Sequence, residues 1–378
     1  MKVMTVLGTR PEAIKLAPVI KQLQQHAARN ELESIVCVTG QHRQMLDQVL
    51  NLFGIAPDID LNLMQESQTL AQLTARVLTT MEPVLSNERP DWIVVQGDTT
   101  TVMASALAAF YLRIRVAHVE AGLRTGDRAN PFPEEVNRLV ADDLSDWLFA
   151  PTQAARRNLL REGYPEPAIC VTGNTVIDAL NEIAQQPCPA EIETLVQPGV
   201  KLVLVTAHRR ENFGRPLENI CEAIAELARR HEDVRFVYPV HLNPNVRETA
   251  HKVLGGLPGV SLLPPVDYLA LVGLMKHSYL ILTDSGGIQE EAPSLGVPVL
   301  VLRENTERPE AVEAGVARIV GTDSARIIAE VERLLSDPAA RASMAQSANP
   351  FGDGQAARRI VDTLITGQRH EYATGAST

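Results

Sequence analysis

The chain opens with the sequence MKVMTVLGTRPEAIK (residues 1–15), which has the order of residue types expected of a strand, a tight loop and a helix. Val3–Leu7 is a short run of apolar and β-branched residues, and the Gly8–Arg10 turn interrupts it. Pro11 stands where the first turn of a helix tolerates proline, because no backbone N–H is needed there. This stretch predicts the strand–loop–helix unit from which doubly wound α/β domains are built.

The same unit recurs through the first half of the chain. Apolar runs without alternation are typical of strands that are buried on both faces of a parallel sheet. They occur at Ile35–Thr39, Trp92–Gln96, Val116–Val119 and Leu148–Ala150. Helical patterns lie between them, at Gln41–Leu52, Leu70–Leu85 and Thr101–Tyr111.

The pattern starts again after the polar, proline-containing segment Gln185–Gly199. The new strands are predicted at Lys201–Val205, Arg235–Pro239, Tyr279–Leu282 and Val297–Leu302, with a helix at Pro216–Arg230. We therefore predict two doubly wound α/β domains in tandem. A ligand is expected at the carboxyl ends of the strands, in the cleft between the domains.

Composition narrows the class of protein. A chain of 378 residues that is 45% hydrophobic can bury a sizeable core and is long enough for two domains. The net charge of -11 argues against a nucleic-acid surface, which needs clustered Lys and Arg. The apolar run at the N-terminus is followed by charged residues too soon for a signal peptide. No apolar run in the sequence is long enough to span a bilayer, so a cytoplasmic protein is expected.

The usual cofactor and metal motifs are missing from the sequence. It has no GxGxxG after a strand, no GxxxxGK[ST], no HExxH and no GxSxG. Its four cysteines are scattered without a CxxC pair, so neither a zinc site nor a disulfide framework is indicated. We expect neither a cofactor nor a metal.

The most informative motif is DSGGIQEE (residues 284–291), which follows a predicted strand and opens a helix. Gly286 and Gly287 allow a ligand to approach the backbone, Ser285 adds a hydroxyl donor, and free N–H groups favour an anion such as a diphosphate. Glu291, one turn later, is placed to accept hydrogen bonds from ribose hydroxyls. The alternative interpretation is a plain helix N-cap with a tight entry, and the motif alone does not decide between the two.

Three acidic positions lie at or near strand ends. Asp98 follows the strand Trp92–Gln96, although an Asp before threonines is more often a helix N-cap. Glu120 ends the strand Val116–Val119, where a carboxylate points into the ligand crevice. Glu134 lies in the first turn of a helix behind two prolines, where an acid also suits the helix dipole.

Basic residues accompany them. His208 follows the strand Lys201–Val205 and is suited to shuttle a proton or to donate to a phosphate. Arg10 and Lys15 lie in the first loop and helix, within reach of an anion, and Arg308 lies in the segment Glu307–Glu310.

Together these motifs closely resemble the non-hydrolysing bacterial UDP-N-acetylglucosamine 2-epimerases, from Met1 to about Ile365 and in the same order. The segments that carry the resemblance are GTRPEAIK, QHRQMLDQVL, GDTTT, HVEAGLRTGD, PEEVNR, TGNTVIDAL, AHRREN, YPVHLNPNVRE, TDSGGIQEEAPSLGVPVLVLR, TERPEAVEAG and NPFGDGQAARRI. The segment Val266–Leu271 departs from it, since relatives often carry Gln and Phe at its first and last positions.

The resemblance implies a glycosyltransferase-B-like fold of two Rossmann-like domains. The first domain is expected at residues 1–170 and the second at residues 171–354. A C-terminal helix of about residues 355–378 is expected to cross back to the first domain. The implied catalytic residues are Asp98, Glu120, Glu134 and His208. The implied UDP-sugar contacts are Arg10, Lys15, Ser285, Gly286, Gly287, Glu291 and Arg308. Residues near an allosteric site for UDP-N-acetylglucosamine are implied at Gln41, Arg209 and His241, and a homodimer is expected.

The expected reaction is reversible inversion at C2 of UDP-N-acetylglucosamine, giving UDP-N-acetylmannosamine for cell-surface polysaccharide precursors. It is expected to proceed by elimination of UDP, a 2-acetamidoglucal intermediate and re-addition from the other face. Three alternatives stay open at this point: a hydrolysing epimerase, an inverting glycosyltransferase on the same fold and a non-catalytic UDP-sugar sensor.

Overall fold

The computed structural model describes residues 1–40, 43–63, 65 and 68–372, so the predicted allosteric residue Gln41 lies outside the described part. Contacts divide the chain into two compact units. Unit 1 comprises Met1–Ala179 together with the chain from Phe351 onward, and unit 2 comprises Leu180–Pro350. Each unit is an α/β domain with a parallel sheet, which confirms the predicted fold class.

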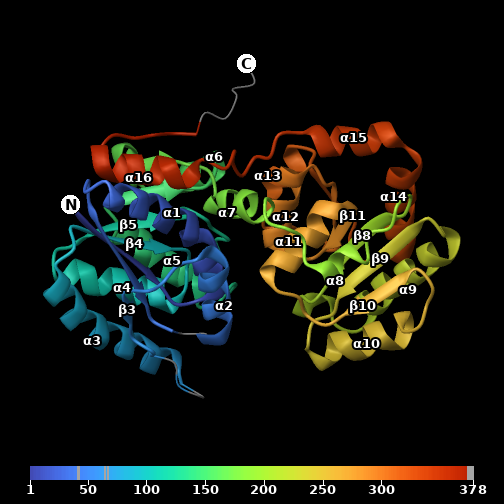
Figure 1. Ribbon diagram of the computed structural model, residues 1–378, viewed down its shortest axis with the longest axis horizontal. Coiled ribbons are helices and arrows are strands. Elements are labelled where there is room, and N and C mark those ends of the chain that lie inside the picture. Colours follow the sequence, from blue (N-terminus) through green and yellow to red (C-terminus); the bar gives the residue numbers. More distant parts are fainter. Residues whose placement is uncertain (41–42, 64, 66–67, 373–378) are drawn as a thin grey trace. The chain divides into compact units, whose positions relative to one another are not determined.

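Unit 1, drawn in blue to green with the red helix α16 in Figure 1, is built on a seven-stranded sheet. Its strand order is β3-β2-β1-β4-β5-β6-β7, and every neighbouring pair is parallel. Its strands are β1 (Lys2–Leu7), β2 (Glu33–Val38), β3 (Ile59–Asp60), β4 (Trp92–Gln96), β5 (Arg115–Val119), β6 (Trp147–Ala150) and β7 (Ile169–Val171). Its helices are α1 (Arg10–Ala28), α2 (Arg43–Phe53), α3 (Leu70–Glu88), α4 (Thr100–Tyr111), α5 (Glu134–Asp143), α6 (Gln153–Arg161), the 3-10 turn η1 (Glu166–Ala168) and α16 (Ala356–Thr366). The helix α7 (Thr175–Ile183) begins in unit 1 and ends in unit 2. The C-terminal helix α16 packs beside α1, at the opposite end of the sequence.

Unit 2 is built on a six-stranded sheet in the order β10-β9-β8-β11-β12-β13, again parallel throughout. Its strands are β8 (Lys201–Thr206), β9 (Val234–Pro239), β10 (Val260–Leu263), β11 (Ser278–Thr283), β12 (Val299–Val301) and β13 (Ala317–Ile319). The connections contain α8 (Ala190–Glu193), η2 (Arg210–Asn212), α9 (Arg215–Arg230), α10 (Pro244–Leu254), α11 (Tyr268–His277), α12 (Gly286–Glu291), η3 (Ala292–Leu295), α13 (Pro309–Glu313), α14 (Ser324–Ser336) and α15 (Pro338–Gln346).

The strand order of each sheet reverses once, and this reversal places the polar residues of interest. In unit 1 it lies between β1 and β4, and in unit 2 between β8 and β11. Crossover helices leave such a point in opposite directions, so that a crevice opens above the carboxyl ends of the two strands. The loops that begin at Gly8, Gly97, Ala207 and Asp284 therefore surround the two reversal points.

A tight turn follows β5 at Gly122, where only glycine fits. Its φ is +82°, and a Cβ built there would lie 2.5 Å from the carbonyl oxygen of Ala155. The close approach allows α6 to pack against this turn, next to the carboxyl end of the sheet. Among the described residues, no helix is long and apolar enough to cross a membrane.

We expect Gly122→Ala to destabilise unit 1 by about 3 kcal/mol, from the positive φ and from the steric overlap with Ala155. Gly126 is the matched control, because its φ is +79° but nothing lies within 4 Å of an added Cβ. Gly126→Ala should therefore cost only about 1 kcal/mol. Both tryptophans, Trp92 and Trp147, belong to unit 1, so urea unfolding followed by tryptophan fluorescence reports this unit. Equal losses in the two variants would contradict the steric explanation.

Candidate active site

Glu120 is the centre of a polar cluster at the reversal point of unit 1. It is the first residue after β5, has φ +70°, and its side chain is only 7% exposed. Its carboxylate pairs with Lys15 Nζ from α1 and accepts hydrogen bonds from Gln96 Nε2 at the end of β4 and from Asn174 Nδ2. Three separate segments thus orient one carboxylate. A Cβ built on Gly97 would lie 3.8 Å from Glu120 Oε2, so this carboxylate lies beside the loop that carries Asp98.

Asp98 is held by α5 rather than by the helix that follows it. Its carboxylate forms an ion pair with Arg138, and its carbonyl oxygen accepts a hydrogen bond from Asn137 Nδ2 at 3.0 Å. The N-cap of α4 is Thr99, whose hydroxyl accepts from the backbone N–H of Val102 at 3.3 Å. The alternative interpretation of Asp98 as an N-cap is therefore wrong.

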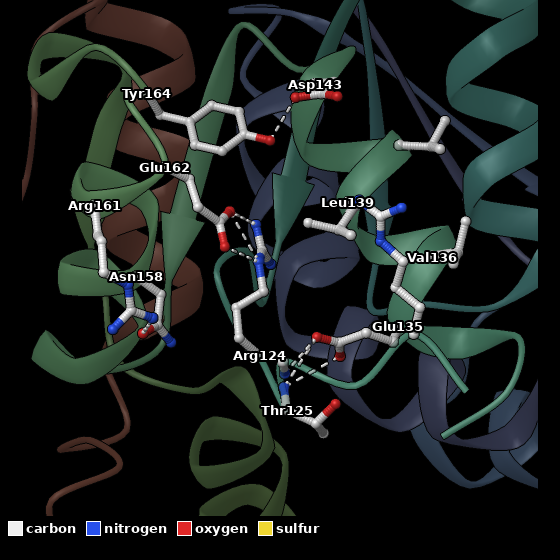
Figure 2. Close-up of a pocket in the computed structure, with 13 residues that line it drawn as sticks. Arg124, Thr125, Glu135, Val136, Leu139, Asp143, Asn158, Arg161, Glu162 and Tyr164 are labelled. Carbon is white, nitrogen blue, oxygen red and sulfur yellow. Dashed lines mark hydrogen bonds and ion pairs between the residues drawn. The ribbon is translucent and has the colours of Figure 1, made fainter. Parts of the chain in front are cut away.

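The two glutamates at the start of α5 have different roles. Glu135 is buried and accepts backbone N–H groups from Thr125 and Gly126 at 3.0 Å, and it also accepts a hydrogen bond from Arg138. Figure 2 shows its carboxylate directed at the backbone of the Thr125 loop. Glu134 is partly exposed, and its carboxylate makes no hydrogen bond or ion pair with any described residue. Glu135 is thus structural, and Glu134 is the one of the pair that is available for chemistry.

A buried carboxylate, Glu12, orders the loop between β1 and α1. It accepts the backbone N–H groups of Gly8 at 2.5 Å and Thr9 at 3.2 Å, and the Thr99 hydroxyl at 2.6 Å. Burial raises the pKa of Glu12 to about 6, although these hydrogen bonds oppose the rise. The loop places Arg10 at the first position of α1, where its side chain is partly exposed.

The reversal point of unit 2 is organised by Asp284, which is fully buried after β11. Its Oδ2 accepts the backbone N–H groups of His208 and Arg209, both at 2.8 Å, and the Asn212 amide at 3.0 Å. Its Oδ1 makes no hydrogen bond and lies 3.7 Å from His208 Nδ1. A small rotation of the imidazole would form a His–Asp pair with Nε2 directed away from Asp284.

His208 is also influenced by its basic neighbours. Its ring stacks on that of His241 with a centroid separation of 5.4 Å and an interplanar angle of 14°. Burial lowers the pKa of His208; the charge of Asp284 opposes this effect, whereas His241 and Arg209 add to it. Two residues predicted near an allosteric site therefore contact or adjoin a predicted catalytic residue.

Two guanidinium groups converge on the start of α12. A Cβ built on Gly286 would lie 3.8 Å from Arg308 Cζ and 3.9 Å from an Arg209 terminal nitrogen. Ser285 occupies the N-cap position of α12 without making a side-chain cap hydrogen bond. The plain N-cap interpretation therefore does not account for its hydroxyl. Small residues and two cations together favour an anionic ligand such as a phosphate group.

Two acids at the end of α12, Glu290 and Glu291, are buried, and each has a partner. Arg308 Nε pairs with the buried Glu290, and Glu291 accepts a hydrogen bond from the Tyr268 hydroxyl at 2.6 Å. Sequence reasoning did not identify Gln96, Arg138 or Asn174, whose importance depends on tertiary contacts, and it gave no separate role to Asp284, the first residue of the DSGGIQEE motif. In the described ranges of the chain, no group of three or more His, Cys, Asp and Glu side chains is arranged to hold a metal ion.

The sequence profile of the UDP-N-acetylglucosamine 2-epimerases matches residues 24–365. The UDP-N-acetylglucosamine 2-epimerase of Escherichia coli K12 is 54% identical over 372 residues, covering 96% of this chain and 98% of that protein. The Neisseria meningitidis UDP-GlcNAc 2-epimerase bound to UDP-GlcNAc has a TM-score of 0.87 and 49% identity, covering 97% of this chain and 100% of that one. The Methanocaldococcus jannaschii enzyme in complex with UDP-GlcNAc and UDP has a TM-score of 0.78 and 39% identity, covering 96% and 99%.

Glu12 predicts a pH-dependent stability of unit 1. Because its pKa is about 6 in the folded chain against an ordinary value of 4.5, the folded state binds the extra proton more tightly. Its contribution to the free energy of unfolding is present below about pH 4.5 and is lost as the pH rises through about 6. Between pH 7 and pH 5 this contribution should grow by about 1 kcal/mol.

Glu12→Gln should remove this dependence, because an amide does not titrate in this range. Its oxygen can still accept the two backbone N–H groups, and its NH2 group can donate to the Thr99 hydroxyl oxygen. Urea unfolding followed by tryptophan fluorescence at pH 5 and pH 7 measures the difference between the wild type and the variant. Glu82→Gln, on the exposed side of α3, is the control and should behave like the wild type. An unchanged pH dependence in Glu12→Gln would show that another group is responsible.

Proposed function

The chain belongs to the UDP-N-acetylglucosamine 2-epimerase family, and from this premise we propose that it interconverts UDP-N-acetylglucosamine and UDP-N-acetylmannosamine without net hydrolysis. The observation that carries the proposal is the presence of an ordered cluster of polar side chains at the reversal point of each sheet. Unit 1 presents Asp98 and Glu120 on neighbouring loops, and unit 2 presents Arg308, Arg209 and His208 around Gly286.

The chemistry explains why both sets of residues are needed. The C2 proton of the sugar is not next to a carbonyl group, so its direct removal would be prohibitively slow. If the C1–O bond breaks first, its electron pair leaves with UDP and an oxocarbenium-like centre acidifies the C2 proton. Transfer of that proton to a carboxylate gives 2-acetamidoglucal. Re-addition of UDP at C1, with protonation of the other face of C2, completes the inversion.

The residues of unit 2 suit the departure of UDP. The guanidinium groups of Arg308 and Arg209 supply positive charge for the diphosphate, and Ser285 supplies a hydroxyl donor. His208 protonates or stabilises the leaving oxygen, with Asp284 behind Nδ1. Glu291, already oriented by Tyr268, would accept a ribose hydroxyl. Arg10 and Lys15 of unit 1 add further positive charge for the substrate.

The residues of unit 1 suit proton transfer at C2. Inversion needs one acid/base group for each face, because a single carboxylate does not reach both. Asp98, with either Glu120 or Glu134, would supply the two faces, and each contributes a rate factor of about 10²–10⁴. Glu120 is the more firmly oriented of the two, whereas Glu134 is the less constrained.

We also propose that UDP-N-acetylglucosamine activates the enzyme at a second site near Arg209 and His241. Because His241 stacks on His208, a ligand that binds His241 would act directly on the orientation of the catalytic imidazole. The enzyme would act as a homodimer and supply precursors of a cell-surface polysaccharide.

The reaction predicts incorporation of solvent hydrogen. With UDP-N-acetylglucosamine alone in deuterated water, UDP-N-acetylmannosamine should form and carry deuterium at C2, because the proton is exchanged on a carboxylate. Proton NMR follows both sugars without added metal or acceptor. Free N-acetylmannosamine and UDP would indicate a hydrolysing epimerase, and complete retention of the original hydrogen would exclude two-face proton transfer. An unchanged spectrum would favour a transferase or a sensor.

Asp98→Asn should lower kcat by about 10²–10⁴-fold, because the amide does not accept the C2 proton. Binding of UDP, measured by titration calorimetry, should be unchanged, since Asp98 is not among the residues proposed to contact UDP. Asp233→Asn, at an exposed ion pair with Lys201, is the control and should retain normal turnover. Normal turnover in Asp98→Asn would remove this carboxylate from the mechanism.

A further inference from the structure

His118 lies in the middle of the unit 1 sheet and faces two hydrogen-bond acceptors. It is completely buried on β5. Its Nδ1 lies 2.6 Å from Asp142 Oδ1 on α5, and its Nε2 lies 2.7 Å from the carbonyl oxygen of Gly97. A carbonyl oxygen only accepts, and so does an ionised carboxylate. Both ring nitrogens must therefore donate.

The number of donors that the contacts require determines the protonation state of the buried His118–Asp142 pair. A neutral imidazole has one N–H, which would leave a nitrogen lone pair facing an oxygen lone pair without water between them. The second proton would otherwise have to be on Asp142. However, Asp142 Oδ2 pairs with Arg124 at 2.7 Å and accepts the backbone N–H of Gly122 at 3.2 Å, and both contacts favour the carboxylate. The extra proton therefore belongs on the ring.

From this geometry we infer that His118 is an imidazolium that positions the catalytic loop by holding the Gly97 carbonyl, and with it Asp98. The part concerning Asp98 rests on the proposed function. Gly97 has φ +82°, and its N–H donates to Val119 O at 3.0 Å, so the His118 contact fixes the other side of the same residue. If the Nε2 proton were lost, the Gly97 carbonyl would face a lone pair and the loop would move.

The charged groups around His118 support this state. Asp142 lies on α5, and Asp98 lies in the loop after β4, where it pairs with Arg138. Arg124 is on the far side of Asp142 and reaches Glu162, as Figure 2 shows, so its charge is shared between two carboxylates. Burial lowers the pKa of His118, but the charge and hydrogen bond of Asp142, the Gly97 carbonyl and the charge of Asp98 together raise it above the ordinary value.

The protonation state can be measured without turnover. We would label the nine histidines with ¹⁵N and record long-range ¹H–¹⁵N spectra, assigning His118 by its loss in a variant. Both ring nitrogens of His118 should still be protonated at about pH 7.5, where an ordinary histidine has lost one of the two protons. A single ring N–H at neutral pH would overturn the inference, even if the protein is an epimerase.

Two variants separate positioning from a general structural role. In His118→Gln the side-chain amide takes the place of Nε2 and can still donate to Gly97. In His118→Asn the amide takes the place of Nδ1, so the contact with Gly97 is lost. Both remove the buried charge beside Asp142. We expect His118→Asn to lower kcat by about a hundredfold, and His118→Gln by about tenfold or less, with similar KM.

Hydrogen–deuterium exchange of the peptide containing residues 97–101 completes the test. It should be faster in His118→Asn than in His118→Gln and the wild type. Equal exchange and equal kcat in the two variants would show that His118 does not act through Gly97. If the wild type had no epimerase activity but showed the expected exchange and ring protons, the proposed function would fail and the loop anchor would stand.

Discussion

The single reversal of strand order in each sheet is the constraint on which the site depends. Neighbouring crossover helices leave the reversal point in opposite directions, so the first residues after the strands are not covered by their own helices. In unit 1 these residues follow β1 and β4, and in unit 2 they follow β8 and β11. A parallel sheet is otherwise buried on both faces, and its carboxyl edge is where polar side chains can be both oriented and reached by a ligand.

Buried charge at these edges is made tolerable by dense hydrogen bonding. Asp284 accepts two backbone N–H groups and an amide, and Glu12 accepts two N–H groups and a hydroxyl. Glu135 repeats the arrangement with the loop at Thr125 and Gly126. An unpaired buried carboxylate would cost several kcal/mol, so each of these three also fixes the shape of its loop. The anchoring acids are therefore different residues from the acids that we propose to react, and in the case of Glu135 and Glu134 the two are next to each other in sequence.

The burial of each strand and the range of each contact explain which parts of the fold and of the candidate site the sequence could predict. The interior strands were located to within two residues, because burial on both faces gives an unbroken apolar run. The strands that were missed, β3, β7, β10 and β13, are the edges of the two sheets and have only two to four residues each. Residues directly after strands were predicted to be functional from their position. Their partners Arg138 and Asn174 were not, because pairing across 40 to 54 positions depends on tertiary structure. Asp284 follows β11 directly and begins the DSGGIQEE motif, but its anchoring contacts with His208 and Arg209 also depend on tertiary structure.

Ion pairs and hydrogen bonds also determine the direction in which the side chains of Arg308 and Glu120 point. Arg308 uses Nε to contact Glu290, which turns the rest of the guanidinium toward Gly286. Glu120 is likewise held through both oxygens, by Lys15 and Asn174 on one and by Gln96 on the other. Compensating charges inside each unit thus do more than offset the cost of burial, since they also select one orientation of the Arg308 and Glu120 side chains.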